Sequence, residues 1–244
     1  MTPGSDDATV ARAAISLLDL TDLAGETTDD AARALSARAR AAGVAAVCVW
    51  PAYVASCAEV LADSPVRVAT VVNFPTGDEP PGTVIDQTRQ ALADGADEID
   101  VVLPYGAWLG GDVDRAAAVL QVVRTEAAGR TVKVIIETGE LPDRAAIDRA
   151  THFAIANGAD FVKTSTGKTP VSATPDAAEI VLEAIEVSGR PVGFKVSGGI
   201  RTLADAAAYL ELADRIMGPA WATPATFRFG ASGLLDALEV ISSS

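Results

Sequence analysis

The sequence predicts a single (β/α)8 barrel, an α/β fold, over residues 1–244, with a short N-terminal extension. Eight apolar runs rich in β-branched residues recur along the chain. Their starts lie about thirty residues apart, which is the length of a strand plus a crossover helix. Most of the stretches between them are rich in alanine and end at a glycine. A chain of 244 residues and 24.9 kDa also suits one closed barrel.

The eight apolar runs are the expected strands. They are Ile15–Leu20, Val44–Trp50, Val66–Phe74, Glu98–Leu103, Val132–Thr138, Phe161–Thr166, Val192–Val196 and Phe227–Ala231. Strands that are apolar on both faces and alternate with helices are typical of a parallel sheet that is covered on both sides. Eight such units predict closure into a barrel.

Helix boundaries can be recognised between these runs. Thr174, followed by Pro175 and Asp176, is the expected N-cap of a helix over residues 174–189. Similar Ala-rich stretches cover residues 27–43 and 111–129. The glycines that we expect to end helices are Gly43, Gly95, Gly129, Gly158 and Gly189. We expect residues 1–8 and 242–244 to be frayed.

Composition and charge limit the classes of function. The chain has 19 basic and 33 acidic residues, and its net charge of -14 argues against binding to nucleic acid or to an anionic membrane. It has neither a signal-peptide pattern nor an apolar run long enough to span a membrane, which predicts a cytoplasmic protein. Cys48, Cys57 and His152 are too few and too scattered for a zinc site or a disulfide framework. His152 falls within an expected helix, which favours a surface or packing role over a catalytic one.

The positions of the lysines are the sharpest chemical signal. Only four of the 19 basic residues are lysines, and all four lie within or just after an expected strand: Lys133, Lys163, Lys168 and Lys195. Charged residues inside barrel strands are rare unless they serve a site. A desolvated lysine next to another cation can become a neutral amine nucleophile. The alternative is that the lysine side chains extend from strand ends into water.

Two acidic residues, Asp100 and Asp19, also interrupt apolar runs. Asp100 and Lys163 each lie five positions after a glycine in the matching segments GADEID and GADFVK, so we expect both side chains to point the same way. A buried carboxylate near lysines can relay protons. The alternative is a purely structural ion pair, and it weighs more for Asp19 than for Asp100.

Glycine-containing segments follow the last three expected strands. They are Thr166-Gly167-Lys168, Ser197-Gly198-Gly199 and Gly230-Ala231-Ser232. Exposed backbone N–H groups can bind an anion, and the last loops of a barrel often hold phosphate. One such glycine would more often mark a simple turn, but three consecutive units predict a phosphate site.

These motifs resemble those of the deoxyribose-phosphate aldolase family, which are class I (Schiff-base) aldolases on a (β/α)8 barrel. The resemblance runs from about Leu17 to Leu238 and rests on LDLT, VATVVNFPTGD, GADEIDVVLPYG, KVIIETGEL, GADFVKTSTGK, VGFKVSGGIRT and RFGAS. It implies cleavage of 2-deoxy-D-ribose 5-phosphate without a metal or another cofactor. The implied partners are a sugar phosphate and small aldehydes, and a homodimer is left open.

The resemblance also implies roles for individual residues. Lys163 would form the Schiff base, Lys195 and Asp100 would exchange protons, Asp19 would support that relay, and Lys133 would be a further cation. The residues implied to surround the substrate hydroxyl and phosphate are Thr166, Gly167, Lys168, Gly198, Gly199, Gly230 and Ser232.

Three departures from the family pattern affect these expectations. The segment after Lys195 is Val-Ser-Gly-Gly, where Pro-Ala-Gly-Gly is frequent, and Gly233 replaces a second serine. The chain also ends in Ile-Ser-Ser-Ser, without the terminal tyrosine of some members. Two rival functions stay open from the residues: a metal-free sugar-phosphate isomerase or epimerase with Asp100 as base, and a non-catalytic sugar-phosphate-binding protein.

Overall fold

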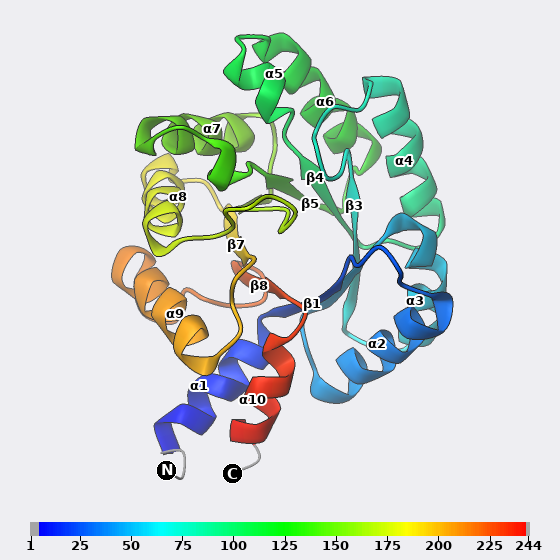
Figure 1. The fold of residues 1–244 in the computed structure, drawn as a ribbon, viewed down its shortest axis with the longest axis vertical. Helices are drawn as coiled ribbons and strands as arrows, with labels where there is room; N and C mark the ends of the chain where they lie inside the picture. The colour runs from blue at the N-terminus through cyan, green and yellow to red at the C-terminus, as the bar shows by residue number, and fades with distance from the viewer. Residues whose placement is uncertain (1–4, 243–244) are drawn as a thin grey trace.

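The computed structural model describes residues 5–242, and these residues form a closed barrel of parallel strands in the order β1 to β8. Helices alternate with the strands and surround the barrel (Figure 1). The predicted (β/α)8 TIM barrel is therefore confirmed. Among the described residues, no helix combines the length and the apolar composition that a membrane span requires.

Each expected strand region contains one strand of the barrel. The strands are β1 (Leu18–Asp22), β2 (Ala46–Val49), β3 (Arg67–Val72), β4 (Glu98–Val102), β5 (Thr131–Ile135), β6 (Phe161–Lys163), β7 (Gly193–Ser197) and β8 (Phe227–Ala231). Most are shorter than the apolar runs that predicted them, because buried residues continue into the loops. After β6 ends at Lys163, for example, Thr164, Ser165 and Thr166 are still buried.

The helices on the outside of the barrel follow the predicted alternation. They are α1 (Ser5–Ser16), α2 (Asp29–Ala42), α3 (Val54–Leu61), α4 (Pro81–Ala93), α5 (Tyr105–Leu109), α6 (Val113–Glu126), α7 (Arg144–Ala156), α8 (Pro175–Ser188), α9 (Leu203–Met217) and α10 (Leu234–Ser242). Thr174 caps α8 as predicted, since its side chain accepts a hydrogen bond from the backbone N–H of Ala177. Gly43 and Gly189 end α2 and α8 in the left-handed conformation.

The N-terminal region differs from the sequence-based expectation. The run Ile15–Leu20 is predicted as a strand, but α1 continues to Ser16 and β1 begins at Leu18. Ala11, Ala14 and Ile15 are buried at a spacing of three and four residues, which is the pattern of a helix face. α1 packs against α9 and α10, and Figure 1 shows α1 beside α10.

Helices cover part of the two ends that are expected to be frayed. Residues 5–8 belong to α1, and Ser242 is the last residue of α10. The remaining residues of that expectation, 1–4 and 243–244, lie outside the described residues.

The inner face of the barrel combines an apolar side and a charged side. On β2 and β3 the small residues Ala46, Cys48, Ala69 and Val71 form an apolar cluster. Next to it, Asp100 on β4 lies in register with Val71 on β3 and with Lys133 on β5. Residues in register on neighbouring strands point to the same side of a sheet. The small apolar residues therefore leave room in the interior for long charged side chains from the other strands.

Candidate active site

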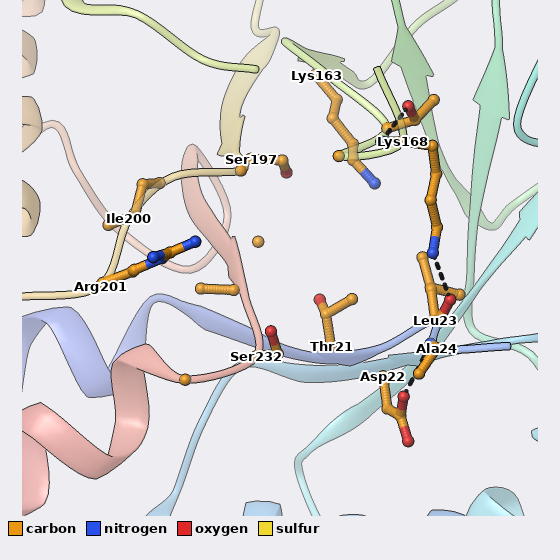
Figure 2. Close-up of a pocket in the computed structure, with 16 residues that line it drawn as sticks. Thr21, Asp22, Leu23, Ala24, Lys163, Lys168, Ser197, Ile200, Arg201 and Ser232 are labelled. Atoms are coloured by element: carbon orange, nitrogen blue, oxygen red, sulfur yellow. Dashed lines mark hydrogen bonds between the residues drawn. The ribbon is translucent and has the colours of Figure 1, made fainter. Parts of the chain in front are cut away.

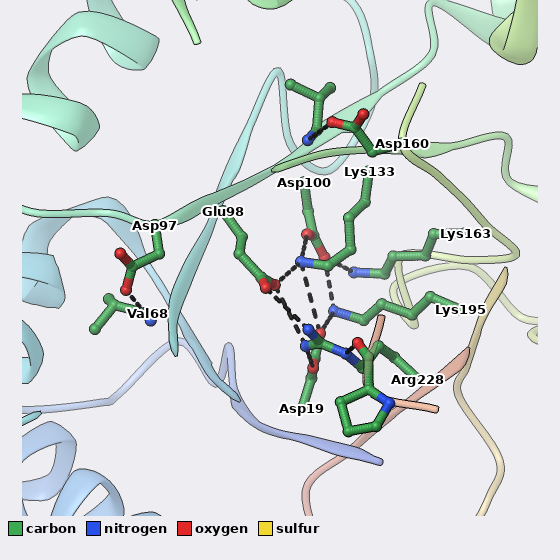
Figure 3. Close-up of polar contacts among 12 residues, drawn as sticks. Asp19, Val68, Asp97, Glu98, Asp100, Lys133, Asp160, Lys163, Lys195 and Arg228 are labelled. Carbon is green, nitrogen blue, oxygen red and sulfur yellow. Dashed lines mark hydrogen bonds and ion pairs between the residues drawn. The ribbon is translucent and has the colours of Figure 1, made fainter. Parts of the chain in front are cut away.

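Seven charged side chains extend into the barrel interior from six of its strands. This interior charge network consists of Asp19 on β1, Glu98 and Asp100 on β4, Lys133 on β5, Lys163 on β6, Lys195 on β7 and Arg228 on β8 (Figure 3). All seven side chains are buried. Charges that are removed from water must be paired, and the contacts below show how each one is.

Asp100 lies at the centre of the network. Its Oδ1 accepts a hydrogen bond from Lys133 Nζ at 2.7 Å. Its Oδ2 accepts from Lys163 Nζ at 2.9 Å and from Lys195 Nζ at 2.8 Å. The expectation that Asp100 and Lys163 point the same way is confirmed, because both side chains reach the same point in the interior.

The other two carboxylates connect the lysines to Arg228. Asp19 Oδ2 lies 2.5 Å from Lys195 Nζ, and Asp19 Oδ1 lies 2.6 Å from Arg228 Nη1. Glu98 Oε2 lies 2.6 Å from Lys133 Nζ, and Glu98 Oε1 lies 3.0 Å from Arg228 Nη2. The ion pairs are therefore continuous from Lys163 to Arg228.

The surroundings of the lysines separate their pKa values. For Lys163, burial lowers the pKa, and the positive charge of Lys195 adds to this effect; together they outweigh the attraction of Asp100. For Lys195, burial also acts to lower the pKa, but Asp100 and Asp19 outweigh it and raise the pKa above its usual range. Lys163 is thus the lysine of the pair that more readily becomes a neutral amine.

The carboxyl group of Asp100 is held in its ionised form. Burial alone would raise its pKa, but Lys133, Lys163 and Lys195 together hold the pKa well below its ordinary value. The pKa of Asp19 is likewise lowered, because Lys195 and Arg228 outweigh the effect of its burial.

A cavity of about 550 Å³ opens above Lys163, and Figure 2 shows the side chains around it. Its walls come from segments at the carboxyl ends of β1, β6, β7 and β8, which is the end of a barrel where active sites lie. The residues that line it include Thr21, Leu23, Lys163, Thr166, Gly167, Lys168, Ser197, Gly198, Arg201, Gly230, Ser232 and Gly233. Six of the seven predicted phosphate-loop residues therefore line one cavity, and Gly199 does not.

At two of these positions a glycine is required, because neighbouring atoms lie too close for a side chain. A Cβ atom on Gly230 would lie 2.2 Å from Ser197 Oγ, and one on Gly198 would lie 2.5 Å from Ser172 Cβ. Gly198 also has a φ of 88°, which residues with side chains rarely adopt. A side chain at Gly230 would therefore displace Ser197, which lines the cavity, and a side chain at Gly198 would displace Ser172.

Comparison with known proteins shows to which family this chain belongs. The sequence profile of DeoC/LacD family aldolases matches residues 13–238. The chain belongs to this family of aldolases. It is 51% identical over 226 residues to a deoxyribose-phosphate aldolase from Agrobacterium fabrum, covering 91% of this chain and 87% of that protein.

Solved structures of similar proteins have the same fold. A candidate deoxyribose-phosphate aldolase of Toxoplasma gondii superimposes with a TM-score of 0.90 at 27% identity, over 98% of both chains. The deoxyribose phosphate aldolase from Aeropyrum pernix, described as a unique tetrameric structure, gives a TM-score of 0.77 over 99% of both chains. Because its identity is 24%, the Aeropyrum pernix structure supports only the fold of this aldolase.

Sequence reasoning missed several residues of the aldolase's interior and cavity. Glu98 and Arg228 belong to the interior charge network. Both are charged residues within apolar strands, which is the same signal that identified the lysines. Arg201, which was not predicted, lines the cavity, and so does Ser197 of the predicted Ser197-Gly198-Gly199 segment. Ser197 Oγ is buried and has no hydrogen-bond partner among the described residues, and no pattern in the sequence indicated this.

Glu137 was also missed, although it lies in the KVIIETGEL motif. Its backbone is left-handed, with a φ of 52°, and its side chain is buried. The carboxylate accepts hydrogen bonds from the Thr166 N–H at 3.1 Å, from the Thr166 hydroxyl and from the Thr169 hydroxyl at 3.2 Å. Burial raises the pKa of Glu137 in spite of these bonds. Glu137 therefore fastens the loop that carries Lys168.

His152 and Cys48 have side chains that can react, but His152 lies outside the site and Cys48 is unreactive within it. His152 is on the outer helix α7, partly exposed, with Nε2 3.6 Å from Asp148 Oδ1, as expected for a surface histidine. Cys48 packs in the apolar cluster of β2 and β3. Burial raises the pKa of the Cys48 thiol, which disfavours the reactive thiolate.

Proposed function

We propose that this aldolase reversibly cleaves 2-deoxy-D-ribose 5-phosphate into acetaldehyde and D-glyceraldehyde 3-phosphate, with Lys163 as the Schiff-base residue. One observation carries the proposal: Lys163 lines the cavity, while its amine shares Asp100 with a second lysine whose charge is retained. A buried amine with a lowered pKa, open to the substrate side only, is suited to attack a carbonyl carbon. The name of the Agrobacterium fabrum relative supports the same substrate.

In the cleavage direction, the neutral Lys163 amine adds to C1 of the open-chain aldehyde, and uptake of one proton with loss of water forms a protonated imine. Removal of the proton from the C3 hydroxyl breaks the C2–C3 bond, releases glyceraldehyde 3-phosphate and leaves its electron pair in an enamine. Protonation of the enamine at C2 and hydrolysis then release acetaldehyde and restore the amine. The protonated imine is the electron sink that makes the bond cleavage feasible.

Asp100 and Lys195 are the groups that we assign to proton exchange. Asp100 is ionised and can accept a proton through a water molecule, and the ammonium group of Lys195 at 2.8 Å can return one. Asp19 orients Lys195, since its Oδ2 lies 2.5 Å from the Lys195 Nζ. Lys133 binds the opposite oxygen of Asp100 and thereby fixes the direction of the carboxylate.

The far end of the cavity suits the phosphate. Gly167, Gly198, Gly230 and Ser232 offer backbone or hydroxyl donors there, and α10 begins at Leu234, so its N-terminal end also favours an anion. Lys168 and Arg201 supply positive charge in a protein whose net charge is -14. We assign Gly199 a supporting role in the same turn. The unpartnered hydroxyl of Ser197, which also lines the cavity, is free to bind a substrate hydroxyl.

The test is a product assay with the purified protein and 2-deoxy-D-ribose 5-phosphate. The proposal predicts acetaldehyde and glyceraldehyde 3-phosphate in equal amounts, and formation of the sugar phosphate when both aldehydes are supplied. Isomerised sugar phosphate without acetaldehyde would establish the isomerase alternative. Binding of the substrate without any turnover would establish the non-catalytic alternative.

A further inference from the structure

The ion pair of Glu98 and Arg228 lies at the opposite end of the barrel from the substrate cavity. The pair forms one wall of a second cavity, of about 880 Å³, which is lined by residues at or before the starts of strands, including Thr131, Asp160 and Pro191. The side chains of Glu98 and Arg228 are only 4% and 7% exposed. Neither residue lines the substrate cavity, so neither is in a position to touch the substrate.

Both residues nevertheless contact the groups around Lys163 (Figure 3). Glu98 pairs with Lys133, which binds Asp100. Arg228 pairs with Asp19, which binds Lys195. Glu98 thus contacts one direct partner of Asp100, Arg228 reaches another through Asp19, and Asp100 binds Lys163.

The network has an unequal number of charges. Lys133, Lys163, Lys195 and Arg228 are four cations, whereas Asp19, Glu98 and Asp100 are three carboxylates. If every group were ionised, one positive charge would be left over in a region from which water is excluded, and this is costly. The excess disappears if one of the lysines is neutral.

The structure favours Lys163 as that lysine. The pKa values of Lys133, Lys195 and Arg228 are raised, because the carboxylates outweigh burial, whereas the pKa of Lys163 is lowered. Other titratable groups also face the network. Cys48 on β2 faces Lys163 and Lys195, and Glu137 after β5 lies within electrostatic reach of Lys163. The Cys48 thiol is neutral because burial raises its pKa, and burial also raises the pKa of the Glu137 carboxyl.

We propose that Glu98 and Arg228 are positioning residues that set the proton occupancy of Lys163 from the opposite end of the barrel. Arg228 supplies the fourth positive charge, which makes loss of the Lys163 proton favourable. Glu98 limits the excess to a single charge. This inference rests on the proposed role of Lys163 as the Schiff-base residue and extends it to two groups that do not touch the substrate.

The proposal predicts shifts of opposite sign for the two residues. Arg228→Met leaves three cations and three carboxylates, so Lys163 keeps its proton to higher pH. Glu98→Gln leaves an excess of two positive charges, so Lys163 loses its proton at lower pH. A unit charge about 10 Å away at an effective dielectric constant of about 20 corresponds to a shift of about one pH unit. The double variant has the wild-type excess of one charge, and its midpoint should return close to the wild-type value.

The experiment measures the rate at which acetaldehyde and borohydride label Lys163 as a function of pH, with peptide mass mapping of the site. It compares the wild type with Glu98→Gln, Arg228→Met and the double variant. Arg130→Met is the matched control, because Arg130 lines the same second cavity but is about half exposed and pairs with Asp97 outside the network. Its charge is screened by solvent, so its midpoint should equal that of the wild type.

The expected result is a midpoint that rises in Arg228→Met, falls in Glu98→Gln and is restored in the double variant. Single variants that shift in the same direction, or that leave the midpoint unchanged while Lys163 is still labelled, would overturn the inference. If Arg228→Met does not fold, the near-isosteric Glu98→Gln must still lower the midpoint, and Arg228→Lys, which keeps the charge, must preserve it. Failure to label Lys163 in the wild type would instead refute the proposed function.

Discussion

Lys163 and Lys195 place their amine nitrogens on the same oxygen atom, Oδ2 of Asp100, at 2.9 Å and 2.8 Å. Two ammonium groups on one carboxylate oxygen repel each other, and little water is present to screen them. Because Lys195 also pairs with Asp19, it retains its proton more readily than Lys163. Of the two lysines, Lys163 is therefore the one that more readily becomes a neutral amine, as its proposed role as nucleophile requires.

Replacing Lys195 with leucine should move the acidic limb of the pH profile of kcat/KM to higher pH. The change removes the repulsion that helps to lower the pKa of Lys163, and it frees Asp100 and Asp19 to stabilise the Lys163 ammonium. Each unit by which the pKa rises reduces the neutral fraction of Lys163 about tenfold at neutral pH. Loss of proton exchange should lower kcat further.

Lys195→Arg is the matched control for this prediction, because it keeps the charge and removes the primary amine. Its acidic limb should stay near that of the wild type while kcat falls. If Lys195→Leu left the acidic limb in place, charge repulsion by Lys195 could not be what activates Lys163.

The phosphate group should make a large contribution to substrate selection. Charge-assisted hydrogen bonds are worth about 1.5 to 3 kcal/mol each. The loss of two of them amounts to at least about a hundredfold in kcat/KM. We therefore expect 2-deoxyribose without its phosphate to be cleaved at least about a hundred times less efficiently than the phosphorylated sugar.

Ser232→Asp places a negative charge at the end of the cavity that we assign to the phosphate. This variant should impair cleavage of the phosphorylated substrate far more than cleavage of 2-deoxyribose, whereas Ser232→Ala should have a smaller effect. The measurement is the ratio of kcat/KM for the two substrates. An unchanged ratio in Ser232→Asp would mean that the phosphate binds elsewhere.

Glu137→Ala should weaken binding of the phosphorylated substrate without removing the chemistry. The Thr166 N–H loses its acceptor, so the loop that carries Lys168 loses its attachment to the segment after β5. A buried donor without a partner costs about 1 to 3 kcal/mol. We expect a KM for the phosphorylated substrate that is at least about five times higher, and a much smaller change for 2-deoxyribose.

Glu137→Gln retains an oxygen that can accept from Thr166, and it should recover most of the lost affinity. A general loss of kcat for both substrates in Glu137→Ala, with KM unchanged, would contradict the assigned role of this residue. Thermal unfolding of both variants provides the check that the barrel is intact.

The sequence is most informative where a residue type conflicts with its surroundings. A lysine or an aspartate within an apolar strand carries a high cost unless it is paired, and this conflict alone identifies Lys163, Lys195, Asp100 and Asp19 as candidate site residues. The same conflict is present at Glu98 and Arg228. Their pairing across the barrel could not be predicted, because it depends on the register and closure of strands that are far apart in the chain.

Other features depend on three-dimensional placement. The hydroxyl of Ser197 has room at its position only because Gly230 on the neighbouring strand has no side chain, and that contact is set by the pairing of β7 with β8. The first strand is misplaced for a different reason. Ile15 continues the apolar run, but together with Ala11 and Ala14 it forms the buried face of a helix. Short apolar runs fit both periods, and tertiary packing decides between them.

The most direct test of Lys163 as the Schiff-base residue is to incubate the wild-type protein with acetaldehyde, reduce it with borohydride and map the modified peptide by mass spectrometry. Reduction of the imine adds an ethyl group to the attacking amine, and we predict this group on Lys163. The Lys163→Arg variant should show no label and no cleavage activity but a folded barrel. A label found on Lys133, Lys168 or Lys195, or found nowhere in an active preparation, would contradict this assignment.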